Sequence, residues 1–230
     1  MNDSSEIFKK KRMLADALSM MEAAQIIDFN GHFSARIGDD SMLINSGASV
    51  RSAITPDDIV QIDLDGNVIG DGPVPPMEFH IHASIYRSRP DVGAVAHAHP
   101  IWSTLFSSVG KKVEPVIMQA AMLGQIQQFD HTASINTKEL GDEVAECLGK
   151  NRVALLKAHG AVIAAEGILE VFVLSYYLEE TAHRQYLASH LGSPAILSSE
   201  QIEKIQKNLW RPHLLEKVWN YHHAKLKICK

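Results

Sequence analysis

The chain has 230 residues, of which 46% are hydrophobic and 21% charged, with a formal net charge of -5. This composition is typical of a globular protein and argues against disorder, collagen-like repeats and a disulfide scaffold. The two cysteines, Cys147 and Cys229, lie far apart, and no basic stripe offers contacts to nucleic acid. Because there is no internal repeat or linker, we expect a single domain over residues 1–230.

No run of about 20 apolar residues could span a membrane, and residues 1–6 lack the basic and apolar pattern of a signal peptide. We therefore expect a cytoplasmic protein. Its twelve histidines stand out beside five tyrosines and three tryptophans. Histidine is the side chain that most often binds metals, so the placement of these residues is the first question.

The first half of the chain alternates between helical and strand patterns. Apolar residues at helical spacing predict an opening helix over residues 7–29, stopped by Asn30 and Gly31. The elements expected next are a hairpin of residues 33–37 and 42–44, a helix start at Thr55–Asp58, a hairpin of residues 59–64 and 67–69 around Asp65 and Gly66, a helix over 77–87 and a strand over 92–99.

The second half predicts more helix. The expected elements are a helix over residues 101–108, a mixed segment over 113–129, a helix over 137–148, two strands over 153–157 and 161–164, and helices over 168–191 and 202–227, the last interrupted at Pro212. A capping-box match at Ser198–Gln201 precedes that last segment. Together the patterns indicate an α/β domain with helical ends.

Two His-x-His pairs differ in what their geometry allows. In a strand, residues i and i+2 point to the same face, so His97 and His99 could converge on one ion. His80 and His82 lie in a predicted helix, where such residues diverge by about 200°, which excludes a shared ion. A third ligand could come from His159, which ends an apolar strand just before Gly160, a residue that permits a sharp turn. Three imidazoles with one open position are typical of a catalytic metal site.

Other interpretations of these residues remain open from the pattern alone. His159 could be a structural histidine, and Glu78 could be a fourth ligand, an acid/base group, or a glutamate that favours the start of a helix. With these residues in place, the chain closely resembles the class II aldolase/adducin family. The resemblance is carried by Glu78, His97 and His99, and His159 with Gly160, and it extends to residues 31–36, 46–48 and 85–91.

The resemblance implies a three-layer αβα fold with a central, mostly antiparallel sheet and helices on both faces. It also implies a homotetramer with sites at subunit interfaces. His97, His99 and His159 would ligate a divalent ion, most often Zn²⁺ and in some members Mn²⁺, Fe²⁺ or Co²⁺, and Glu78 would act as the catalytic acid/base. Non-catalytic adducin heads lack the full histidine set that this chain retains.

The chain departs from the phosphosugar members of the family around the substrate. His32 stands where they carry asparagine, Pro75–Met77 replace serines, and Gln119 replaces a tyrosine proton donor. These departures favour a substrate carboxylate, and the residues expected to bind substrate are His32, Ser46, Gly47 and Arg51. Arg36 is a further arginine that could pair with an anion, although a purely structural surface role suits it better.

We therefore expect a divalent-metal-dependent C–C lyase, a decarboxylase or an aldolase. It would act on a small hydroxy-carbonyl or hydroxy-aromatic acid through a metal-stabilised enolate. The alternatives are a sugar-phosphate aldolase, epimerase or dehydratase of the same family, and a non-catalytic adducin-like scaffold. The aromatic residues and histidines of the C-terminal segment are expected to serve packing, because aromatic residues at helical spacing usually do.

Overall fold

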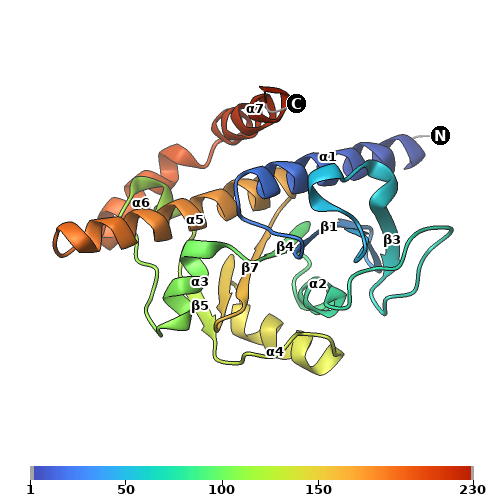
Figure 1. Ribbon diagram of the computed structural model, residues 1–230, viewed down its shortest axis with the longest axis horizontal. Helices are drawn as coiled ribbons and strands as arrows, with labels where there is room; N and C mark the ends of the chain where they lie inside the picture. The colour runs from blue at the N-terminus through green and yellow to red at the C-terminus, as the bar shows by residue number, and fades with distance from the viewer. Residues whose placement is uncertain (1–2, 229–230) are drawn as a thin grey trace.

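The computed structural model describes residues 3–228, and its centre is a seven-stranded sheet (Figure 1). The strands follow the order β3-β2-β1-β4-β7-β6-β5, and every neighbouring pair is antiparallel except β5 and β6. Their bounds are β1 His32–Ile37, β2 Ser41–Asn45, β3 Ile59–Asp63, β4 Ala94–Ala98, β5 Ile126–Phe129, β6 Val153–Leu156 and β7 Gly160–Ala165.

Helices cover both faces of this sheet and complete a three-layer α/β fold (Figure 1). One layer contains α1 (Asp3–Ala23), α3 (Ile101–Ser108) and α5 (Ile168–Leu191), with α6 (Ser199–Leu209) and α7 (Pro212–Ile228) packed outside it. The other layer contains α2 (Phe79–Ser88) and α4 (Lys138–Leu148). Three short 3-10 helices are η1 (Arg51–Ala53), η2 (Pro56–Asp58) and η3 (Met118–Met122). The expectation of a three-layer fold with a mostly antiparallel sheet is confirmed.

Alternation along the central strands separates the core from the polar side chains. In β1, Phe33 and Ala35 pack into the core beneath α1 and α5. His32 and Ser34 project from the opposite face, towards α2. The antiparallel pairing of β1 with β4 sets His32 directly beside His97. The sheet therefore brings two buried histidines together from positions 65 residues apart in the chain.

Several predicted elements are confirmed, including the helices over 101–108 and 168–191 and the capping box at Ser198 and Gln201. His80 and His82 diverge on α2 as expected, since His82 is fully buried whereas His80 is partly exposed. Cys147 is a free, half-buried thiol, and Cys229 lies outside the described residues.

Three boundaries differ from the prediction. Helix α1 ends at Ala23 rather than residue 29, because Gln25 takes a left-handed backbone conformation with φ of 58°. The helix expected from Thr55 is only the single turn η2. Residues 67–69 form no strand, because their pairing with β3 is reduced to one bridge between Ile62 and Val68.

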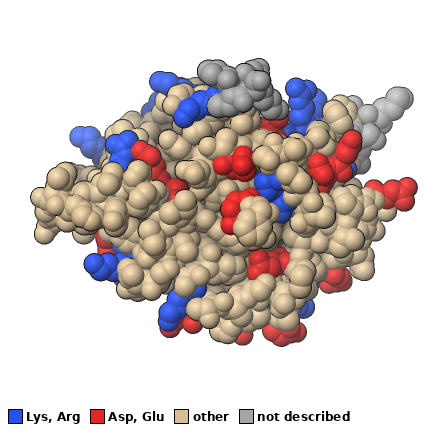
Figure 2. All heavy atoms as spheres, viewed as in Figure 1, with Lys and Arg blue, Asp and Glu red and all other residues tan. Residues whose placement is uncertain are grey.

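The surface carries its charges in mixed, scattered positions. On the face drawn in Figure 2, basic and acidic side chains are interspersed, and neither sign forms a continuous stripe. Among the helices that the structure describes, none combines the length and apolar composition that a membrane span requires.

The start of α3 is capped by a carboxylate from α5. Glu179 Oε1 accepts a hydrogen bond from the Trp102 amide at 2.7 Å, and Oε2 accepts from the Ser103 amide at 3.0 Å and its hydroxyl at 3.2 Å. Burial raises the pKa of Glu179, and these donors oppose that rise. The carboxylate thus satisfies amides that no helix can satisfy itself, and it ties two helices together.

Glu179→Ala is expected to lower the free energy of unfolding by about 2 kcal/mol, because it leaves buried donors unpartnered. Urea denaturation would measure the loss. Glu180→Ala is the matched control, since its carboxylate lies on the outer side of α5 and pairs with Arg184. Equal losses in the two variants would contradict the capping role.

Candidate active site

A cavity of about 850 Å³ gathers the predicted site residues. It lies beside the ends of β1 and β4 and the turn between β6 and β7, and the segment Pro73–Met77 forms its opposite wall. The predicted residues that line it are His32, Ser46, Gly47, Arg51, Glu78, His99 and His159. His97 is fully buried directly behind them.

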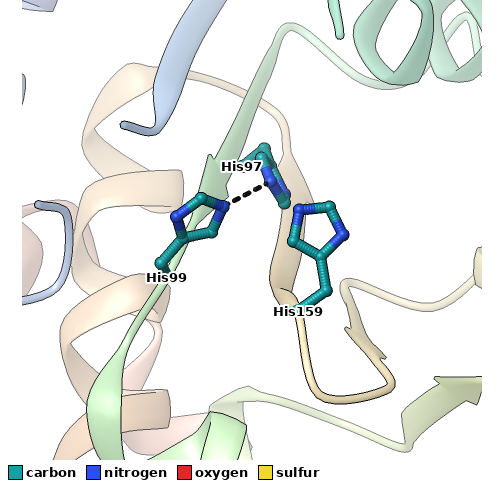
Figure 3. A group of neighbouring side chains, drawn as sticks. All are labelled: His97, His99 and His159. Atoms are coloured by element: carbon teal, nitrogen blue, oxygen red, sulfur yellow. Dashed lines mark hydrogen bonds between the residues drawn. The ribbon is translucent and has the colours of Figure 1, made fainter. Parts of the chain in front are cut away.

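Three of the histidines form a compact cluster. His97 lies in β4, His99 follows the end of that strand, and His159 lies in the turn before β7; the three rings point towards one another (Figure 3). The Nε2 atoms of His97 and His99 are 3.1 Å apart. The ring centroid of His159 lies 4.9 Å from that of His97 and 5.2 Å from that of His99.

This donor set fits a divalent ion. His97 Nδ1 donates to the Ala161 carbonyl at 3.1 Å, so its Nε2 presents a lone pair to the cluster. Asp28 Oδ1 lies 3.6 Å from His99 Nδ1, the ring nitrogen that does not face His97. Tetrahedral zinc with Zn–N bonds of about 2.0–2.1 Å sets its nitrogens about 3.4 Å apart, close to the separation seen here. One atom from each of His97, His99 and His159 lies within 4.8 Å of the others, so the cluster could hold a metal.

Burial keeps the cluster in the protonation state that a metal needs. Burial lowers the pKa of His97 well below its usual range, and it lowers the pKa of His159 as well. Both imidazoles are therefore neutral at neutral pH and have a lone pair to offer. The Nδ1 atom of His159 is buried without a hydrogen-bond partner among the described residues.

The turn that carries His159 depends on a close approach of two strands. Ala158 takes the left-handed conformation with φ of 51°, and the turn-forming conformation thus falls one residue before His159. We expected Gly160 to allow the turn, but its role is instead to let β7 pack closely against the end of β4. A Cβ there would collide with the Ala98 carbonyl and lie 2.8 Å from Cδ2 of His99. The missing side chain lets β7 approach the end of β4.

Glu78 is the N-cap residue of α2, but its carboxylate does not cap that helix. Oε1 accepts hydrogen bonds from Ser134 Oγ at 2.7 Å and from the Ile135 amide at 2.8 Å. Oε2 lies 3.6 Å from His32 Nε2 and 3.5 Å from His97 Nε2. The carboxylate therefore faces the histidine cluster rather than its own helix.

The surroundings of Glu78 favour its ionised form. Burial alone would raise its pKa, but four effects outweigh burial and hold the pKa well below its usual range. These are the neighbouring His32, 3.6 Å away, any positive charge on His97, which only acidic pH would add, and the donors Ser134 and Ile135. Glu78 is thus a carboxylate at neutral pH and can accept a proton.

Arg51 is a buried guanidinium at the edge of the cavity. Nε donates to the Gly31 carbonyl at 2.9 Å, and Nη1 donates to the Ser46 carbonyl at 3.3 Å and to Ser49. Nη2 makes no hydrogen bond within the described part of the chain, which leaves this nitrogen for an anion. Arg36, by contrast, donates to the carbonyls of Val92, Tyr86 and Arg89 and has only a structural role.

The loop beside Arg51 uses its amides internally. The amide of Ser46 donates to the Asp58 carbonyl, that of Gly47 to the Val74 carbonyl, and that of Ala48 to Ser46 Oγ. A Cβ on Gly47 would lie 3.2 Å from Cα of Pro76, so the proline segment packs directly on this loop.

A sequence profile described as the Class II Aldolase and Adducin N-terminal domain matches residues 12–186. The chain belongs to this family. The matched range includes all eight predicted site residues, from His32 to His159. The resemblance inferred from spaced histidines and Glu78 is therefore confirmed at the level of the family.

Members of the class II aldolase/adducin family with assigned names include both aldolases and decarboxylases. An L-fuculose phosphate aldolase of Methanococcus maripaludis is 29% identical over 189 residues, which cover 82% of this chain and 99% of the relative. Decarboxylase NovR of Streptomyces niveus is 31% identical over 185 residues, which cover 79% of this chain and 67% of the relative. Relatives of both reaction types thus match at similar identity.

Solved structures of the family share the fold. The L-fuculose 1-phosphate aldolase from Glaciozyma antarctica PI12 superposes with a TM-score of 0.87 at 20% identity, covering 100% of this chain and 92% of that one. The l-fuculose-1-phosphate aldolase from Thermus thermophilus gives a TM-score of 0.67 at 25% identity, and the match covers 78% of this chain and 94% of that one.

Sequence reasoning missed several residues that contact the class II aldolase-like site. Ser134 and Ile135 hold Glu78 from a loop more than 50 residues away in sequence. Ser34, His82 and Tyr86 lie behind His32 in a buried hydrogen-bonded group. The one available signal was a polar residue, Ser34, at an inward-facing strand position.

Proposed function

We propose that the chain is a divalent-metal-dependent carbon–carbon lyase, with decarboxylation favoured over aldol cleavage. The observation that carries this proposal is the ionised Glu78 carboxylate, 3.5 Å from His97 and 3.8 Å from His159, in a cavity beside three imidazoles. Relatives named as aldolases and as decarboxylases support a lyase of this family. The substrate would be a small hydroxy-carbonyl or hydroxy-aromatic acid.

His97, His99 and His159 would hold the ion, most simply Zn²⁺, which three imidazole ligands suit. When bound, the ion would supply a Lewis acid for a substrate oxygen. The open side of the cluster faces the cavity, because His99 and His159 both line it. Glu78 lies at the same side and could approach the ion as well.

Glu78 would move the proton. In aldol cleavage, the ionised Glu78 accepts the proton of the substrate hydroxyl, the C–C bond breaks with its electron pair left on the neighbouring carbon, and an aldehyde departs; Glu78 then returns the proton to that carbon. In decarboxylation, the electron pair of the C–CO₂ bond stays on the substrate carbon as CO₂ departs, and Glu78 delivers a proton taken from water to that carbon. Either way one proton enters and leaves the carboxylate in each cycle.

The anion-binding side favours a carboxylate over a phosphate. Three amides of the loop Ser46–Ala48 already donate within the protein, so they offer little to a phosphate. Pro76 has no amide hydrogen to replace them. The remaining donors are Arg51 Nη2 and His32, which suit two carboxylate oxygens.

A second candidate is a sugar-phosphate aldolase, epimerase or dehydratase. The match to L-fuculose phosphate aldolase of Methanococcus maripaludis supports it, because that relative is covered over 99% of its length. The third candidate, an adducin-like scaffold without catalysis, receives no support from the intact histidine and glutamate set.

We also propose a homotetramer with sites at subunit interfaces, as the family resemblance implies. Exposed apolar side chains on α3, with Ile101 50% and Leu105 46% exposed, are consistent with a covered surface in an assembly. Light scattering on the purified protein would measure its mass; a monomer at micromolar concentration would contradict this proposal.

A substrate panel distinguishes the candidates. Protein loaded with Zn²⁺ or Mn²⁺ is incubated with hydroxy-aromatic acids, hydroxy-keto acids and ketose phosphates, and CO₂ and aldehyde are detected separately. We expect CO₂ from an acid substrate, loss of turnover with a chelator, and recovery when the metal is restored. Aldehyde from a ketose phosphate would favour the second candidate. No product from any substrate, together with no stoichiometric metal, would favour the scaffold.

A further inference from the structure

A line of hydrogen bonds runs from the hydroxyl of Tyr86 to the active-site histidine His32. Tyr86 Oη lies 2.7 Å from Ser34 Oγ, and Ser34 Oγ lies 2.7 Å from His82 Nδ1. His82 Nε2 lies 2.7 Å from His32 Nδ1. His32 Nε2 then faces Glu78 Oε2 at 3.6 Å. Of these five side chains, only His32 and Glu78 belong to the site predicted from the sequence.

All four residues behind Glu78 are enclosed by protein. The exposed fraction is 5% for His32, 2% for Tyr86, and zero for Ser34 and His82. A buried polar group must find its partner within the protein, so the donors and acceptors along this line can be counted. Tyr86 Oη bonds to Ser34 Oγ, and the Val95 carbonyl lies beside this pair, 3.5 Å from Ser34 Oγ.

The Glu78 carboxylate sets the direction of the bonds. A carboxylate only accepts, so the Nε2 atom that faces Glu78 carries a hydrogen, and Nδ1 of a neutral His32 must accept. His82 Nε2 is then the donor to His32, which leaves His82 Nδ1 to accept from the Ser34 hydroxyl. Ser34 in turn accepts from the Tyr86 hydroxyl, which needs no further acceptor.

The opposite direction is unfavourable at the Glu78 end. A lone pair on His32 Nε2 would then face the Glu78 carboxylate, with no hydrogen between the two. Burial also raises the pKa of Tyr86, so its hydroxyl keeps its hydrogen, and burial lowers the pKa of His82 well below its usual range, so that ring is neutral. Both groups are therefore uncharged, and the line is one of neutral hydrogen-bonding partners.

We propose that Tyr86, Ser34 and His82 are positioning residues that hold His32 as its Nε2–H tautomer, with that donor facing the cavity beside Glu78, where it binds the carboxylate of the substrate. The consequence for catalysis rests on the proposed function, whereas the tautomer does not. His32 thus contributes a hydrogen-bond donor of fixed position, as a side-chain amide would. Because imidazole has two tautomers, this donor stays on Nε2 only if the buried hydrogen bonds of His82, Ser34 and Tyr86 hold that tautomer.

The test compares two substitutions at His82. Gln at this position can still donate an amide hydrogen to His32 Nδ1, whereas Leu cannot. In zinc-loaded protein with ¹⁵N-labelled histidine, NMR should show His32 protonated on Nε2 in wild type and His82→Gln, and a mixture of tautomers in His82→Leu. His80→Leu, two residues along α2 and partly exposed, is the matched control and should match wild type.

Kinetics give the second measurement. His82→Leu is expected to lower kcat by about 10- to 100-fold, the usual effect of losing a residue behind a site, while His82→Gln should restore most of it. Ser34→Ala breaks the same line at another point and replaces His82→Leu if that variant does not fold. A His32 ring protonated on Nδ1 in wild type, or a tautomer unchanged in both broken variants, would overturn the proposal. An inactive wild type with the expected tautomer would overturn only the lyase assignment.

Discussion

His97→Ala is expected to lose both stoichiometric metal and turnover, the largest effect of any single substitution in this chain. His97 is fully buried, its Nδ1 is fixed by the Ala161 carbonyl, and its Nε2 lies at the centre of the cluster. Two remaining imidazoles cannot complete the three-ligand arrangement. Metal content by mass spectrometry should fall to less than about one-tenth of wild type.

The control for this loss is His80→Ala, which removes a partly exposed imidazole from α2. It should keep wild-type metal content and activity. Circular dichroism and thermal unfolding would establish that both variants fold. Full metal content in folded His97→Ala protein would show that the ion binds elsewhere and would remove the basis of the proposed site.

Glu78→Gln is expected to lower kcat by about 10³-fold while the protein keeps its metal. The amide has nearly the same shape and can still accept from Ser134 and Ile135, but it cannot take a proton from the substrate. In the proposed site Arg51 and the histidine cluster bind the substrate, so KM should change by less than about threefold. Steady-state kinetics and metal analysis on the same sample would measure both.

The pH dependence of kcat/KM tests the direction of the pKa shift of Glu78. The pKa of Glu78 is held below its usual range, so the carboxylate persists as the pH falls through the range where an ordinary glutamate is protonated. The acid limb of kcat/KM in wild type should therefore not reflect protonation of Glu78 near its usual pKa. Turnover of Glu78→Gln within about threefold of wild type would mean that another group moves the proton.

The sequence predicted most of the fold because the local patterns agree with the tertiary structure. The helix of residues 168–191 and the strand pair around His159 carry strong apolar periodicity, and their bounds match the structure closely. Residues 67–69 follow the expected turn at Asp65 and Gly66 and hydrogen-bond to β3, but they form one bridge instead of the predicted strand, because a turn specifies a full hairpin only if the second strand finds enough partners.

The candidate site was predictable in part, for a related reason. His97 and His99 are two residues apart, so their convergence follows from strand geometry alone. The contact of His82 with His32 joins residues 50 positions apart, and it depends on how β1 pairs with β4 and how α2 packs on them. No local pattern contains that information, and the same holds for the contact of Ile135 with Glu78.

The pairing of β1 with β4 makes the hydrophobic core a determinant of the chemistry. Phe33 and Ala96 are paired and point into the core, so the neighbouring pair His32 and His97 points to the opposite face of the sheet. A shift of β1 by one residue against β4 would exchange the two faces, burying an imidazole in the apolar core and turning a phenyl ring towards Glu78. The same strand register therefore fixes both the packing of the core and the position of His32 beside His97.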